Sequence, residues 1–121
     1  MQRISSEDWQ RCDVTGPVVV LTALGALPDA ERIARALVEE RLAACVNIVP
    51  GITSIYRWKG AVEQEAELLL VIKTMAAQLD ALKARLLELH PYELPEVVVL
   101  PIGGGHQAYL DWIAEQVGPL S

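Results

Sequence analysis

The chain has 121 residues, a formal net charge of −6 and an apolar fraction of 52%. This length fits one domain with its own core, which must be aliphatic because the chain has no phenylalanine. The negative charge argues against nucleic-acid binding, and no run of about 18 apolar residues is present to cross a membrane. The polar, acidic start lacks the apolar region of a secretion signal, which predicts a cytoplasmic protein.

The first third of the sequence predicts an arm, a strand and a helix. Residues 1–16 are polar and are expected to form an N-terminal arm, whereas residues 17–121 are expected to form a single domain. Residues 18–24 are apolar and β-branched, which is typical of a buried strand. Residues 27–44 place apolar side chains at helical spacing, and Asp29 is a suitable N-cap for that helix.

The middle of the sequence predicts a long β-hairpin. Residues 45–58 form the first strand, and the Pro-Gly pair at 50–51 predicts a bulge because proline lacks a ladder donor. The Lys-Gly pair at 59–60 predicts a tight turn into the return strand, residues 61–74. Strands of about 14 residues exceed the usual five or six, so the hairpin is expected to project beyond its own domain.

The last third predicts a second helix, a strand and a third helix. Thr74 is a candidate N-cap for the second helix, which Pro91 ends. Its buried stripe is expected to consist of Leu79, Leu82, Leu86 and Leu89. Residues 96–102 predict another strand, and residues 106–117 predict the C-terminal helix.

The order of these elements predicts an α+β fold. The β-α-β-β-α-β series is that of the ferredoxin-like, split βαβ arrangement, to which the sequence adds a C-terminal helix. Right-handed crossovers place both long helices on one face of an antiparallel sheet. The long exposed edge of the hairpin invites pairing with another chain, so we expect edge-to-edge association into an oligomer.

Three segments carry a resemblance to a known family. The stretches ACVNIVPGITSIYRWKG, ELLLVIKT and LHPYELPEVVVLPI occur in that order and resemble the CutA divalent-cation tolerance family. The resemblance covers about residues 17 to 117. It implies a homotrimer with a ferredoxin-like subunit, similar in architecture to the PII nitrogen-signalling proteins.

The resemblance also bears on copper. Some family members bind copper through a cysteine of the first strand and paired histidines before the Pro-Tyr motif. In this sequence Thr22 stands at the cysteine position and Leu89 at the first histidine, so His90 alone remains. The sequence therefore departs from the copper-binding pattern of those members.

The HPYELPE segment carries the first candidate site residues. His90 is the candidate metal ligand or proton-transfer group, because imidazole suits copper or zinc; alternatively it is a cation at the negative end of the preceding helix. Tyr92 and Glu93 lie between Pro91 and Pro95, whose rigidity can aim side chains at a ligand. The alternative is a turn that only sets the entry of the next strand.

The hairpin carries the other candidates. Lys73 follows an apolar run, so its amine is expected to pair with Glu67 or Glu93 and to bind an anion, or else to form a salt bridge between subunits. Trp58, with Tyr56 nearby, is a candidate ligand-binding residue, but packing between subunits is the role that its place beside the turn favours.

Three carboxylates and two thiols complete the inventory. Glu63, Glu65 and Glu67 share one strand face at spacings of about 7 Å, which suits a hard cation or guards the edge against aggregation. Cys45 is interpreted as a small core residue, and Cys12 lies in the arm.

Three functions stay open at this point. The first is a cytoplasmic homotrimer that responds to divalent cations, with copper as the candidate cofactor and His90 as its ligand. The second is a PII-like sensor or scaffold that binds a small anionic metabolite between subunits through Lys73, Tyr92 and the last helix. The third is a mainly structural trimer. We do not expect an enzyme, because no nucleophile, base and acid form a recognisable catalytic set.

Overall fold

The computed structural model of the protein describes residues 14–119. Its strands are β1 (Pro17–Leu24), β2 (Cys45–Trp58), β3 (Ala61–Met75) and β4 (Val98–Pro101), and its helices are α1 (Leu27–Glu39), α2 (Leu79–Leu89) and α3 (Gln107–Gln116). The four strands form one antiparallel sheet in the order β2-β3-β1-β4. This is the predicted α+β, split βαβ arrangement with an added C-terminal helix.

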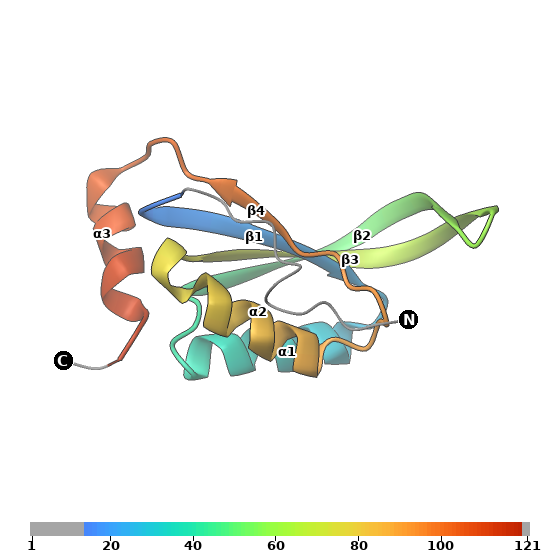
Figure 1. Cartoon of the computed structure of the whole chain (residues 1–121), viewed down its shortest axis with the longest axis horizontal. Helices are drawn as coiled ribbons and strands as arrows, with labels where there is room; N and C mark the ends of the chain where they lie inside the picture. The colour runs from blue at the N-terminus through green and yellow to red at the C-terminus, as the bar shows by residue number, and fades with distance from the viewer. Residues whose placement is uncertain (1–13, 120–121) are drawn as a thin grey trace.

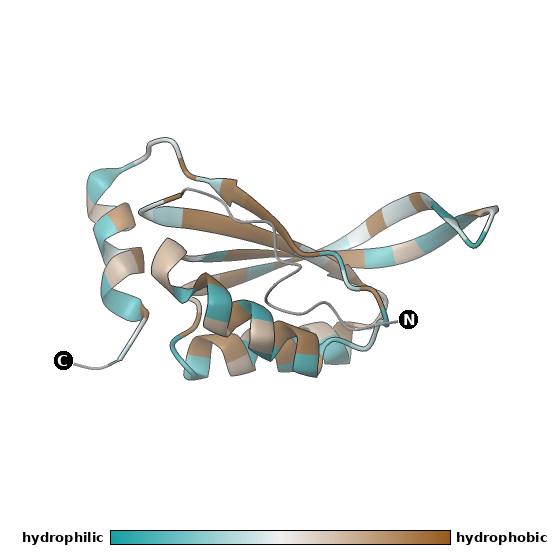
Figure 2. Ribbon diagram, viewed as in Figure 1, coloured by the Kyte–Doolittle hydropathy of each residue, from teal (hydrophilic) through white to brown (hydrophobic). Residues whose placement is uncertain are grey.

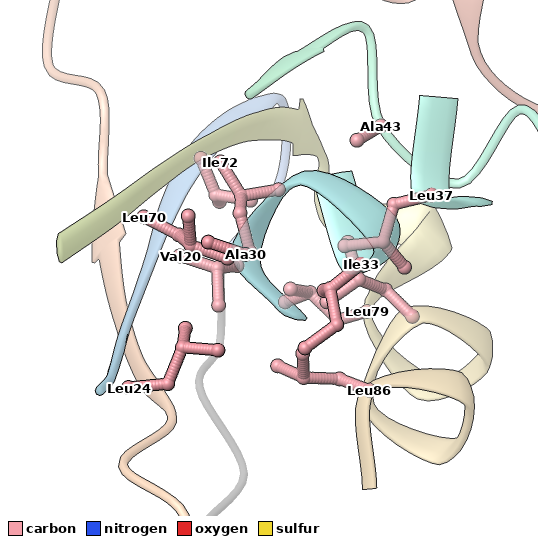
Figure 3. Packing of buried hydrophobic residues seen from close by; sticks show 12 residues of the cluster. Val20, Leu24, Ala30, Ile33, Leu37, Ala43, Leu70, Ile72, Leu79 and Leu86 are labelled. Atoms are coloured by element: carbon pink, nitrogen blue, oxygen red, sulfur yellow. The ribbon is translucent and has the colours of Figure 1, made fainter. Parts of the chain in front are cut away.

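An aliphatic core joins α1 and α2 to one face of the sheet. Figure 1 shows these two helices side by side beneath the strands. Alternate strand residues point toward the helices, and Ile33, Leu70 and Leu86 are fully buried where the elements meet (Figure 3). Figure 2 shows the corresponding pattern of hydropathy, with apolar strands and helices whose outer surfaces are hydrophilic.

The long hairpin forms as predicted. β2 and β3 pair antiparallel along their length, with one register shift between Val49 and Ile52 at the Pro-Gly pair. The turn at Lys59 and Gly60 has φ values of 49° and 83°, the left-handed conformation that a tight hairpin turn requires. The hairpin extends well past the rest of the sheet (Figure 1).

The other face of the sheet is left largely uncovered. Val18 and Val20 are buried in the core, so Val19 between them points to the opposite face. Its cross-strand neighbour Leu100 is 45% exposed, and Val98 is 43% exposed. α3 packs only at the end of the sheet away from the hairpin (Figure 1). The uncovered face is therefore an exposed apolar surface.

Helix α1 ends five residues earlier than the predicted boundary at residue 44. Arg41 has a φ of 60°, a left-handed conformation that terminates the helix and turns the chain toward β2. Its guanidinium donates hydrogen bonds to the carbonyls of Gly118 (2.7 Å) and Glu115 (3.0 Å). The residue that ends α1 therefore also anchors the end of α3.

Both predicted N-caps were wrong. Ala26 precedes α1, and Asp29 lies in the first turn, where it pairs with Arg32 at 3.3 Å. Thr74 belongs to β3, and its hydroxyl donates to the carbonyl of Leu42 instead of capping α2. Pro91 and the leucine stripe of α2 are as predicted, since α2 ends at Leu89 and its stripe packs on the core.

The N-terminal arm falls mostly outside the described residues, as does Cys12, so the predicted arm and domain boundary stay predictions. Within the described part, Val14 packs against the core. None of the helices among residues 14–119 is long and apolar enough to cross a membrane.

Candidate functional site

A cleft opens where the hairpin leaves the body of the domain. It has a volume of about 720 Å³ and lies between the hairpin strands and the 90–96 loop that follows α2. Its walls combine aromatic and acidic side chains, contributed chiefly by Tyr56, Trp58, Glu63, Glu65, Glu67, Tyr92, Glu93 and Glu96. A concave site with apolar walls and a few polar groups is the usual form of a ligand-binding pocket.

The bulge in β2 brings the hairpin side chains to the cleft. β2 carries one extra residue between Val49 and Ile52, so the side chains that follow change face relative to those that precede. As a result Ser54 lies opposite Glu65, and Tyr56 lies opposite Glu63. The Pro-Gly pair therefore sets which residues line the wall of the cleft.

Two tyrosines hydrogen-bond to two of the glutamates. The Tyr92 hydroxyl donates to Glu67 Oε2 at 2.6 Å, and Glu67 is only 8% exposed. Burial, together with this hydrogen bond, raises the pKa of Tyr92 above its usual value. A hydrogen bond to Glu65 raises the pKa of Tyr56 to about 12. Both phenols thus stay protonated and act as donors at neutral pH.

His90 lies behind Tyr92 and is only 6% exposed. Its Nε2 is 3.0 Å from the carbonyl oxygen of Ala23, and its Nδ1 accepts a hydrogen bond of 3.1 Å from the Tyr92 amide. Burial lowers the pKa of His90 below its ordinary value. The imidazole is therefore neutral at physiological pH, and both ring nitrogens have partners within the chain.

Lys73 is placed away from the cleft. It lies six residues beyond Glu67 on the same strand, roughly 20 Å along β3, and its amine donates to the Asn47 side chain. The expected pairing of Lys73 with Glu67 or Glu93 was wrong. Lys73 and Glu67 point to the same face of β3, but they are too far apart along the strand to pair. Cys45 lies directly opposite Lys73, partly exposed on the uncovered face instead of in the core.

The structure thus brings together most of the predicted residues. Trp58, Glu67, Tyr92 and Glu93 line the cleft, whereas His90 supports it from behind and Lys73 lies elsewhere. Sequence reasoning missed the carbonyl of Ala23, for which no side-chain signal exists. The sequence left open whether the glutamate row binds a cation or guards the edge, and in the structure the three glutamates line the cleft together with Tyr56 and Trp58.

Side chains that could bind a metal are spread out over the part of the chain that the structure describes. Within residues 14–119, no three histidine, cysteine, aspartate or glutamate side chains are grouped so as to hold a metal ion. Thr22 is buried in the core-facing row of β1, and Leu89 packs against the same core. A single chain therefore offers carboxylates around a cleft instead of a closed metal centre.

Comparison with known proteins assigns the chain to a family. Residues 18–116 match the CutA1 divalent ion tolerance protein family. The chain belongs to this family. CutA1 proteins are not known enzymes, which agrees with the expectation from the sequence.

Named relatives come from bacteria, animals and plants. The divalent-cation tolerance protein CutA of Thermus thermophilus is 56% identical over 100 residues, covering 83% of this chain and 97% of that protein. Protein CutA of Homo sapiens is 50% identical over 86 residues, covering 71% and 48% respectively. The chain therefore spans nearly all of the bacterial protein but about half of the human one.

Solved CutA structures share the fold. The Thermus thermophilus protein superposes with a TM-score of 0.82 at 55% identity, covering 84% of this chain and 99% of that chain. A protein of Archaeoglobus fulgidus, described as periplasmic, superposes with a TM-score of 0.81 at 35% identity, covering 84% of this chain and 99% of that chain.

The names of the relatives differ in the location that they give. An Oryza sativa relative, 47% identical over 79% of this chain and 54% of its own length, is named chloroplastic. Because these locations differ, the cytoplasmic location stays a prediction.

Proposed function

We propose that this CutA1 protein binds a cation in the cleft at the base of its hairpin, and that this binding underlies its role in divalent-cation tolerance. The observation that carries the proposal is the charge of the cleft, which is lined by five glutamates and one arginine. Carboxylate oxygens are the ligands that hard divalent cations prefer. Glu67 is the one buried carboxylate of the lining, with 8% exposure, and the lower local dielectric strengthens its attraction for a cation.

We further propose that the cleft is completed in a homotrimer. Two features favour association: the uncovered apolar face, where Val98 and Leu100 are more than 40% exposed, and the free edges of β2 and β4 at opposite sides of the sheet. Pairing the β2 edge of one copy with the β4 edge of the next is a head-to-tail contact, the kind that builds a ring when its rotation closes. The number three comes from the family resemblance.

A shared site also accounts for the ligands that one chain lacks. Because no three ligands are grouped within residues 14–119, a cation in the cleft would meet one or two of its glutamates, Glu65 among them, and take its further donors from a neighbouring copy. Copper is the less suitable cation here, since it favours imidazole and thiolate, and both nitrogens of His90 already have partners.

The two alternative functions fit the structure less well. A small anionic metabolite would face the acidic wall, and Lys73, the residue expected to attract it, does not line the cleft. A purely structural trimer leaves the cleft and its paired tyrosines and glutamates without a role. The exposed apolar face fits the cation-binding trimer and the purely structural trimer equally well, so it does not distinguish between them.

Calorimetric titration tests the proposal. Calcium, manganese, zinc and copper are titrated into the wild-type protein, into Glu65→Gln and into Glu31→Gln. Loss of the Glu65 charge is expected to weaken binding of the preferred cation about ten- to a hundredfold. Glu31 is an exposed glutamate of α1, so its variant is expected to bind like the wild type. The proposal fails if no cation gives a binding isotherm, or if the two variants bind equally well.

A further inference from the structure

The starting point is the hydrogen bonding of His90. The Tyr92 amide is a donor, so Nδ1 must accept and carry no proton, and the proton of the neutral ring must then lie on Nε2. That N–H points at the Ala23 carbonyl at 3.0 Å, which is the acceptor it needs. The contacts therefore select one tautomer.

The same ring connects two strands through the loop. Ala23 belongs to β1 and Glu67 to β3, and neither is next to Tyr92 in the sequence. His90 fixes the backbone of Tyr92 against the end of β1, and the Tyr92 hydroxyl then reaches Glu67 at 2.6 Å. The rings of His90 and Tyr92 also meet edge to face, with centroids 4.9 Å apart.

We infer that His90 is a positioning residue of the cleft: its neutral imidazole holds the Tyr92 backbone so that the phenol is directed onto Glu67. Glu67 is the most deeply buried carboxylate of the lining, so the phenol that bonds to it determines how many of its oxygens face a ligand. This role differs from metal ligation, because a metal at Nδ1 would have to displace the Tyr92 amide.

The inference rests on the proposed function only for the claim that the cleft holds a ligand. The test described next uses no ligand, so failure of the positioning role can be distinguished from failure of cation binding.

Two substitutions separate the two hydrogen bonds of His90. Asparagine accepts hydrogen bonds from the amide two residues further on, so His90→Asn keeps an acceptor for the Tyr92 amide while losing the donor to Ala23. Glutamine is longer by one methylene, so His90→Gln can still donate to Ala23 but no longer presents an acceptor at the Nδ1 position. If His90 only filled space, the asparagine and glutamine variants would be expected to behave alike.

The readout is the ionisation of the Tyr92 phenol. Tyrosine labelled with ¹³C at Cζ is followed by NMR from about pH 8 to 11, around the ordinary tyrosine pKa, with Tyr92→Phe to assign the signal. In the wild type and in His90→Asn the phenol is expected to stay protonated over this range. In His90→Gln, which loses a hydrogen bond to a charged partner, the phenol is expected to begin to ionise within the range, about one pH unit or more earlier than in the wild type.

The inference is overturned if Tyr92 of His90→Gln stays protonated over this range as in the wild type, or if Tyr92 of His90→Asn ionises as early as that of His90→Gln. Should neither variant fold, ¹⁵N spectra of the wild-type histidine decide the question at neutral pH. A protonated Nε2 and an unprotonated Nδ1 at His90 support the positioning role, and a protonated Nδ1 contradicts it.

Discussion

Replacing Leu100 with lysine is expected to leave the subunit folded but to prevent its association. Leu100 is 45% exposed on the uncovered face of the sheet, so a lysine there remains solvated in the single subunit and changes its stability by about 0.5 kcal/mol or less. In the proposed trimer this face lies between subunits, where an unpaired ammonium costs several kcal/mol. Sedimentation velocity should show monomers, and circular dichroism should show native secondary structure.

The matched control for this experiment is Val38→Lys. Val38 is an aliphatic residue of α1 that is 41% exposed. Its exposure is close to that of Leu100, but it lies on the helical layer instead of the uncovered face. Val38→Lys is expected to sediment like the wild type. A Leu100→Lys protein of wild-type size would show that this face is not the subunit contact, as would dissociation of both variants.

Replacing Tyr92 with phenylalanine is expected to destabilise the protein more than any other loss of a tyrosine hydroxyl. The change leaves the ring in place but removes the donor to Glu67, a residue that is only 8% exposed. Hydrogen bonds to charged groups contribute about 1.5–3 kcal/mol to stability, so the free energy of unfolding should fall by roughly that amount. Urea unfolding at one fixed chain concentration measures it.

Tyr109→Phe serves as the control for that measurement. Tyr109 is 41% exposed on α3, where its ring stacks on Trp112 with centroids 5.6 Å apart. Removal of its hydroxyl should change stability by about 0.5 kcal/mol or less. Equal losses in the two variants would mean that the contact with Glu67 adds nothing specific.

The fold was largely predictable because its strongest signals are local. Alternating and β-branched residues indicated the strands, the Pro-Gly pair indicated the bulge, and the Lys-Gly pair indicated the turn. The end of α1 was not predictable in this way. Arginine rarely adopts the left-handed conformation seen at Arg41, and the hydrogen bonds that hold it there reach α3, which is distant in sequence.

The candidate site was predictable only in part. Tyr92 and Glu93 follow from the proline-bounded loop, and Trp58 and Glu67 from the hairpin. The expected pairing of Lys73 with Glu67 could have been excluded from the sequence, since six residues of a strand span about 20 Å. The environment of His90 depends on a backbone carbonyl of β1, which no side-chain motif can indicate.

The account as a whole depends on neighbouring copies that cover the apolar sheet face and complete the cleft. Sedimentation equilibrium of the wild-type protein at micromolar concentration tests this directly. The account predicts a single species with three times the 13.2 kDa mass of the chain. A stable, soluble species of 13.2 kDa would contradict it, because the uncovered face and the free strand edges would then have no partner.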